Sequence, residues 1–227
     1  MMTQMYQGVV EDRNDPLSLG RVRIRFVGLH SEDKLKIKTE DLPWAYPVQP
    51  ITSAAMNGIG TSPLGPVEGT WVVGFFRDQN MQQPVYFGTL GGVPQEVSDP
   101  QQGFNDPNGR YPLEPYVGEP DTNRLARGQE EGTIVEIKKE NVDRLTTTVG
   151  GGQTEEIEEP TPPFAAQYPF NHVKETESGH IQEFDDTPDA ERIQTYHRSG
   201  TFEEIHPDGT RVVKVVSKNY TVKLRDL

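Results

Sequence analysis

The amino-acid sequence predicts an all-β protein made of two strand-rich parts joined by a long acidic segment. Three observations support this fold class. Apolar residues recur with a period of two in several short stretches, 22 glycines and 19 prolines can separate those stretches, and no long stretch has a helical period. We therefore expect a barrel domain at residues 1–97, a Pro/Gly-rich linker at residues 98–170 and a second β-segment at residues 171–227.

The composition excludes several classes of protein. The 227 residues include no cysteine, so no disulfide framework, thiolate nucleophile or cysteine-based metal site can form. Lys and Arg number 22 against 35 Asp and Glu, and the resulting net charge of −13 argues against nucleic-acid binding. The longest apolar run, residues 71–76, is far shorter than the ~20 residues needed to span a bilayer, and the N-terminus lacks the features of a signal peptide. A soluble, non-secreted chain is expected.

Five short strands are predicted in the N-terminal part. The clearest is residues 21–26, where Val22, Ile24 and Phe26 alternate with arginines, so that one face of the strand is apolar and the other is wet. The other four are residues 6–10, 45–49, 70–76 and 85–90. Five short strands within ~90 residues favour a small barrel of the oligonucleotide/oligosaccharide-binding (OB) type.

The wet face of residues 21–26 carries a row of three basic side chains, Arg21, Arg23 and Arg25. A single-stranded nucleic acid would require a cationic groove with aromatic side chains on which bases stack. The row is matched by acidic residues just before it, namely Glu11, Asp12 and Asp15. We therefore interpret it as a solvated or protein-contacting face rather than a phosphate track.

The middle of the chain has the composition of a linker. Residues 98–163 hold 8 of the 19 prolines, and their acidic residues outnumber the basic ones 14 to 6. Within this segment, residues 132–149 have some strand character, which would suit an edge strand or a weakly ordered strap. The acidic run at residues 155–159 is interpreted as solvated.

In the C-terminal part, turn sequences recur every 8–12 residues. They separate five predicted strands, residues 180–185, 192–197, 201–206, 211–216 and 220–224. So short a sheet with few apolar side chains would be marginal alone, and a three-chain intertwined prism would complete its core. The residues expected in the trimer core are Ile181, Phe184, Tyr196, Phe202, Ile205, Val213, Val215, Tyr220, Val222 and Leu224.

Three stretches of the sequence carry a resemblance to known proteins. The first two are residues 9–30, VVEDRNDPLSLGRVRIRFVGLH, and residues 42–76, LPWAYPVQPITSAAMNGIGTSPLGPVEGTWVVGFF. Both resemble the N-terminal barrel of the central spike family of T-even-like contractile-tailed phage baseplates. The opening of its triple-stranded β-helix resembles residues 171–212, which include ETESGHIQEFDDTP. Spikes of type VI secretion share this architecture and remain the alternative.

The resemblance implies a homotrimeric spike in the virion, assembled in the host cytoplasm. Such a spike docks under a trimeric hub protein and pierces the host outer membrane, through transient contact, when the tail sheath contracts. A small PAAR-like tip protein could cover its far end. The residues expected to dock to the hub are Arg21, Arg23, Arg25, Ile51, Met56 and Ile59.

The sequence departs from the best-known member of the family, which carries a helical lysozyme domain between its barrel and its spike. Residues 98–163 lack a long apolar helical pattern that could hold a raised-pKa acid opposite a second carboxylate. We therefore expect no enzymatic activity and no catalytic residues, with a spike that retains peptidoglycan hydrolase activity as the alternative.

No metal ligands or cofactors are expected either. His172, His180, His197 and His206 are 8, 17 and 9 residues apart, which is not the spacing of common ligand motifs. The aspartates at positions 185, 186 and 189 lack the alternating ligands and distal Glu of an EF-hand, and we interpret them as a polar turn.

Overall fold

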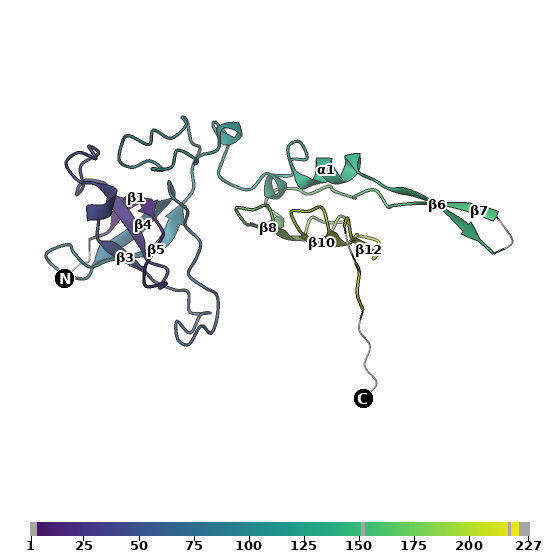
Figure 1. Cartoon of the computed structure of the whole chain (residues 1–227), viewed down its shortest axis with the longest axis horizontal. Helices are drawn as coiled ribbons and strands as arrows, with labels where there is room; N and C mark the ends of the chain where they lie inside the picture. The colour runs from purple at the N-terminus through teal and green to yellow at the C-terminus, as the bar shows by residue number, and fades with distance from the viewer. Residues whose placement is uncertain (1–3, 151–152, 218, 223–227) are drawn as a thin grey trace. The chain divides into compact units, whose positions relative to one another are not determined.

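A computed structural model describes residues 4–150, 153–217 and 219–222. The chain divides into two compact units, Met1–Asp121 and Thr122–Leu227 (Figure 1). This division differs from the expected one. Residues 98–121 belong to the first unit, and the rest of the expected linker belongs to the second.

A closed five-stranded barrel forms the first unit, as the sequence predicts. Its strands are β1 (Tyr6–Asp12), β2 (Val22–Phe26), β3 (Trp44–Pro47), β4 (Trp71–Phe76) and β5 (Pro84–Leu90). They close in the order β1-β2-β3-β5-β4, with β3 parallel to β5 and the other pairs antiparallel. Two 3-10 helices accompany the barrel, Thr39–Asp41 and Glu114–Tyr116.

The period-two pattern of β2 places its apolar side chains inside the barrel. Val22, Ile24 and Phe26 are buried and pack in one cluster with residues of β1, β3, β4 and β5. Strands β4 and β5 approach so closely that a Cβ atom on Gly74 would lie 2.2 Å from the carbonyl oxygen of Val85. Only glycine fits there, next to the register shift between Val73 and Gly74.

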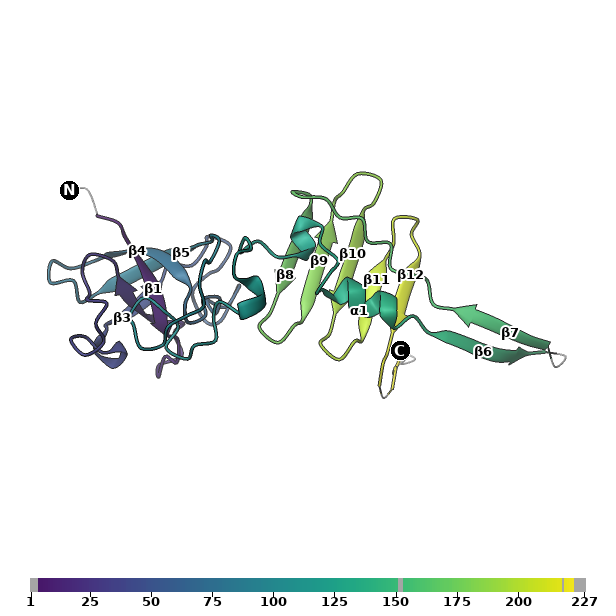
Figure 2. The same ribbon diagram turned by 90° about the horizontal axis from the view of Figure 1, so that it is seen from above.

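The second unit contains a five-stranded antiparallel sheet in the order β12-β11-β10-β9-β8. Its strands are β8 (Asn171–Glu175), β9 (Ile181–Asp185), β10 (Arg192–Tyr196), β11 (Phe202–Ile205) and β12 (Arg211–Lys214). One face of the sheet, which we call the inner face, is covered by helix α1 (Ile134–Glu140) and by residues 164–166 (Figures 1 and 2). A 3-10 helix, Leu125–Arg127, contributes to the same core.

Helix α1 lies where the sequence suggested strand character, and that expectation was wrong for residues 134–140. Thr133 begins the helix, because its side-chain oxygen accepts a hydrogen bond from the backbone N–H of Val135 (3.2 Å). Ile134, Val135 and Lys138 form its buried side. A helix of seven residues has only two turns, too few for a helical period to stand out in the sequence.

A two-stranded hairpin follows α1 and extends beyond the sheet (Figure 2). It pairs β6 (Arg144–Val149) with β7 (Gln153–Glu158) in antiparallel register. Strand β7 contains most of the acidic run, and its described glutamates are exposed. The predicted strand at residues 220–224 is absent from residues 219–222, where the structure describes no strand, and Leu224 lies outside the described residues.

Candidate interaction surfaces

The predicted basic row on β2 is not a free cationic surface. Each arginine pairs with one of the acidic residues that precede the row in the sequence. The pairs are Arg21 with Asp15 (2.6 Å), Arg23 with Asp12 (3.5 Å) and Arg25 with Glu11 (2.5 Å). Because Arg21 and Arg25 are buried, the expectation of a solvated row is wrong for these two side chains. Neighbouring loops cover this side of the barrel.

Arg25 is the most deeply buried of the three, with no solvent-exposed surface. Its guanidinium donates to both carboxylate oxygens of Glu11, at 2.5 and 3.1 Å. It also donates to the backbone carbonyls of Ser31 (2.6 Å) and Ile37 (2.8 Å), and so holds the loop between β2 and β3 against the barrel. The Arg25 side chain is therefore structural in this chain and is not available to dock to a partner.

Residues 98–121 wrap onto the barrel instead of forming a free linker. The backbone N–H of Phe104 donates to Glu11 (3.1 Å). A Cβ atom on Gly103 would lie 2.5 Å from the Arg25 side chain, so a larger residue would disturb the ion pair. Asp106 is buried and accepts hydrogen bonds from backbone N–H groups of residues 108, 110 and 111. In residues 98–121, an acidic side chain such as Asp106 thus stabilises a local turn.

Two of these arginines also contact aromatic side chains beside the row. The guanidinium of Arg23 lies 4.5 Å from the centre of the Trp44 ring, and that of Arg21 lies 5.5 Å from it. Arg21 also lies 5.4 Å from the centre of the Tyr46 ring. These cation–π contacts use the ring faces on which a nucleic-acid base would stack.

The other residues expected to dock to the hub lie on an exposed loop between β3 and β4. Ile51, Met56 and Ile59 are all exposed, and Met56 and Ile59 pair through an isolated β-bridge. The backbone N–H of Ala54 donates to the carbonyl of Ile59 (3.2 Å), which folds the loop back on itself. Neighbouring exposed apolar side chains are typical of interaction sites. Docking of this loop to a hub stays a prediction.

On the inner face of the second sheet, buried charged groups connect α1 to the strands. Lys138 of α1 lies 2.5 Å from Glu204 and donates to Gln194 at 2.6 Å. Arg192 donates to Glu183 (2.6 Å) and to Glu204 (2.8 Å). All five side chains are buried. We call this set the inner-face network.

The sequence did not reveal the inner-face network, because charged residues at alternate strand positions resemble a wet face. Strand β9 alternates Ile181 and Glu183 on the inner face with Phe184 on the other. Both faces of the sheet therefore carry apolar residues, and the alternation alone does not tell which face is covered.

Stability should fall at acidic pH in both units. The hydrogen bond from Arg21 holds the pKa of Asp15 far below its ordinary 3.8. Burial alone would raise the pKa of Glu204, but the Lys138 charge lowers it below its ordinary 4.5. In the barrel, burial lowers the pKa of His30 below 6.5.

For all three groups the folded state favours the deprotonated form, so their stabilising contributions are present above the unfolded pKa values and are lost as pH falls through the folded ones. The urea midpoint should therefore drop slightly from about pH 7 to about pH 5, as His30 gains a proton, and more steeply by about pH 3.5. An equal or higher midpoint at about pH 3.5 would contradict this assignment.

The ten residues expected in the trimer core do not form one surface. Ile181, Tyr196 and Phe202 lie in the inner-face core with α1, so this chain buries them by itself. The remaining described residues lie on the opposite, outer face of the sheet or beyond β12. They are Phe184, Ile205, Val213, Val215, Tyr220 and Val222. A helix from the expected linker thus supplies part of the core that the sequence assigned to other copies.

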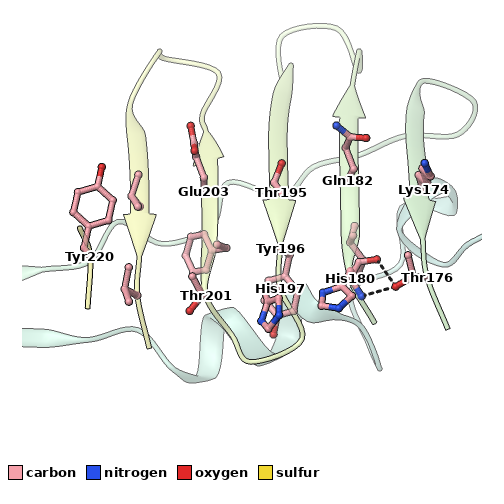
Figure 3. Close-up of a pocket in the computed structure, with 14 residues that line it drawn as sticks. Lys174, Thr176, His180, Gln182, Thr195, Tyr196, His197, Thr201, Glu203 and Tyr220 are labelled. Atoms are coloured by element: carbon pink, nitrogen blue, oxygen red, sulfur yellow. Dashed lines mark hydrogen bonds between the residues drawn. The ribbon is translucent and has the colours of Figure 1, made fainter. Parts of the chain in front are cut away.

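The outer face carries an open groove of about 620 Å³ (Figure 3). Its lining crosses the sheet from Lys174 on β8 to Val213 on β12, and Tyr220 lies at its end. Two further apolar side chains of this face, Phe184 and Ile193, are 47% and 46% exposed. In the single chain these apolar side chains are open to solvent, among polar ones such as Lys174, Gln182 and Glu203.

The described residues contain no group of three or more His, Cys, Asp or Glu side chains arranged to hold a metal ion. The aspartate turn is structural at Asp185, which is buried and accepts from the backbone N–H (3.0 Å) and hydroxyl (2.6 Å) of Thr187. Among the same residues, no helix has the length and apolar character to cross a membrane.

Comparison with known proteins agrees with this architecture. Over 248 aligned residues the chain is 45% identical to Protein Gp5 of Vibrio phage KVP40, covering 96% of this chain and 59% of that protein. It is 52% identical over 132 residues to the pre-baseplate central spike protein Gp5 of Enterobacteria phage T4, covering 56% of this chain and 22% of that protein. The chain thus spans less than two thirds of the length of either relative.

A family model described as the Gp5 N-terminal OB domain matches residues 28–163. The match includes three of the five barrel strands, β3, β4 and β5, and continues into the second unit. Strands β1 and β2 precede it, since β2 ends at Phe26. Because the match extends over more than half of the residues, this chain belongs to the Gp5 N-terminal OB domain family.

Proposed function

We propose that this chain is a structural component of a contractile phage-tail baseplate, in which three copies form the central spike. The T4 relative is named a pre-baseplate central spike protein, and the KVP40 relative is similar over nearly all of this chain. Both relatives are phage proteins, which favours a virion location over a type VI secretion spike. Assembly would take place in the host cytoplasm.

The observation that carries the proposal is the set of exposed apolar side chains on the outer face of the second sheet. Phe184, Ile193 and Val213 are each between 44% and 47% exposed, whereas α1 already covers the inner face. Burying these side chains against other copies would remove apolar surface from water, at roughly 25 cal/mol per Å². The sheet also ends at β8 and β12, whose outer edges can pair with strands of another chain.

The purified chain should have the mass of a trimer by light scattering coupled to size exclusion at micromolar concentration. Replacing Phe184 and Ile193 together by lysine should shift the mass toward a monomer, because charges cannot be buried unpaired in an apolar interface. Ile137→Lys is the matched control, since Ile137 is 49% exposed on the helix that covers the inner face. A monomeric wild type, or a double variant that stays trimeric, would contradict the proposal.

The exposed β3–β4 loop is proposed as the surface that docks under the trimeric hub. It presents Ile51, Met56 and Ile59, and the half-buried Arg23 lies on the barrel wall. In electron micrographs of assembled particles, this loop should be covered by a neighbouring protein. A loop left open to solvent would contradict its role in docking.

The proposed mechanism is mechanical. Interchain strand pairing satisfies backbone groups at the sheet edges and gives the spike rigidity, so that sheath contraction can drive it through the host outer membrane. A small tip protein would cover strand edges at its far end. No nucleic acid takes part, because the arginines of β2 are already paired with carboxylates.

We infer that the chain itself does not cleave peptidoglycan. Some acidic side chains of residues 98–163 have structural partners, for example Glu159 with Lys214 (2.7 Å) and Asp106 with backbone N–H groups. A cell-wall clearing assay with the pure chain should show no lysis. Lysis that persists after purification to homogeneity would favour the alternative, a spike with hydrolase activity.

A further inference from the structure

Two histidines face each other across neighbouring strands of the second sheet. His180 immediately precedes β9, and His197 immediately follows β10. Since the register pairs Ile181 with Tyr196, the two histidines are the next cross-strand pair. Their ring centres are 4.5 Å apart and their planes are inclined by 45°. Figure 3 shows the rings side by side at the lower end of the outer-face groove.

Hydrogen bonds at one nitrogen orient both rings. Nδ1 of His197 lies 2.8 Å from the hydroxyl of Ser199 and 3.2 Å from its backbone nitrogen. Nδ1 of His180 lies 3.5 Å from the backbone nitrogen of Arg198, which is a longer contact. The Nε2 atoms are therefore the ring nitrogens left for a ligand, and both belong to rings on one side of the sheet.

We propose that His180 and His197 form a two-histidine chelate for a borderline divalent transition metal such as Zn²⁺ or Cu²⁺. Neutral imidazole is a preferred ligand of these ions, and two rings held on adjacent strands bind with the advantage of a chelate. Water fills the other coordination positions, since the described residues bring no third His, Asp, Glu or Cys to the pair.

The surroundings accommodate the proton change that metal binding requires. Coordination through Nε2 places the ring proton on Nδ1, where a second-shell acceptor normally receives it. At His197 the hydroxyl of Ser199 is in place to accept that proton, while the 3.2 Å hydrogen bond that the backbone N–H of Ser199 donates to Nδ1 is given up. At His180 the change gives up only the 3.5 Å contact with Arg198. In the single chain, before other copies cover the groove, His180 is half-buried and His197 is exposed, so the ion can reach the pair.

A bound ion would join the end of β9 to the end of β10, next to the turn at residues 198–200. Zn²⁺ should therefore raise the thermal midpoint of the second unit, because a ligand that binds only the folded state stabilises it. The effect should weaken at acidic pH, since a protonated imidazole cannot coordinate a metal.

Isothermal titration of the full chain with Zn²⁺, in a buffer that does not chelate, tests the proposal. His197→Ala and His180→Asn should each weaken binding by about tenfold or more, because each leaves a single imidazole. His172→Ala is the matched control and should change the affinity less than about twofold. His172 is an exposed histidine of the same sheet that pairs with Asp186 at 3.6 Å.

Cu²⁺ provides a second measurement that does not depend on affinity. Its electron paramagnetic resonance spectrum should show two nitrogen ligands in the wild type and fewer in His197→Ala. Circular dichroism confirms that each variant is folded. The proposal is overturned if the wild type binds no Zn²⁺, if the three variants bind it equally, or if the Cu²⁺ spectrum does not change.

Discussion

Replacing Lys138 by methionine should lower the free energy of unfolding of the second unit by about 3–5 kcal/mol. The substitution keeps most of the side-chain volume but removes the cation that lies 2.5 Å from Glu204. Glu204 would then be a buried carboxylate with one cationic partner, Arg192, in place of two. An unpaired or under-paired buried charge costs more than an exposed pair contributes, because water cannot solvate it.

The chain provides an internal reference for this measurement. Both of its tryptophans, Trp44 and Trp71, lie in the barrel, so tryptophan fluorescence reports on the first unit alone. Circular dichroism at fixed chain concentration reports on both units. Lys138→Met should therefore shift the circular dichroism transition and leave the fluorescence transition in place.

Lys139→Met is the matched control, one residue along the same helix. Lys139 pairs with Glu130 at 2.6 Å, but both side chains are partly exposed, and such a pair contributes at most about 1 kcal/mol. Equal losses in the two variants would show that the inner-face network contributes no more than a surface ion pair.

Replacing Arg25 by methionine should destabilise the barrel by a similar amount, about 3–5 kcal/mol. The change leaves the fully buried carboxylate of Glu11 without its guanidinium partner. It also removes the hydrogen bonds to the carbonyls of Ser31 and Ile37. Here the fluorescence transition should move, because it follows the unit that contains the substituted residue.

Two further variants test whether the loss of stability in Arg25→Met comes from the buried, unpaired carboxylate of Glu11 or from the substitution of any charged residue. Lys36→Met removes an exposed pair with Asp33 and should change stability by less than about 1 kcal/mol. The double variant Arg25→Met, Glu11→Met should be more stable than Arg25→Met alone, because it removes the orphaned charge. A double variant less stable than the single one would contradict the burial argument. Recovery should be incomplete, since Glu11 also accepts from Thr39 (2.8 Å) and Phe104 (3.1 Å).

The barrel could be predicted because its strands have one apolar face. In β2, Val22, Ile24 and Phe26 recur at every second position, and all three are buried. The pairing of the three arginines with Glu11, Asp12 and Asp15 was also visible, since the two sets are joined by one hairpin. Their burial was not, because it depends on residues 31–39 and 103–104 reaching over β2 from elsewhere in the chain.

The second unit was harder to predict, because its sheet carries charged and apolar residues on both faces. Glu183, Arg192 and Glu204 look like solvent-facing positions until Lys138 is placed opposite them. Lys138 belongs to a seven-residue helix in a segment whose composition is that of a linker. The trimer-core prediction consequently mixed side chains of the covered and the open face.

By itself, the sequence determined the all-β class, the five barrel strands and four of the five strands of the second sheet, because alternation and turn residues are local properties of the chain. Only the tertiary structure decided which face of the second sheet is covered, where the first unit ends, and which charges are buried. Those features depend on contacts between segments far apart in the sequence, such as Lys138 with Glu204, which local patterns do not record.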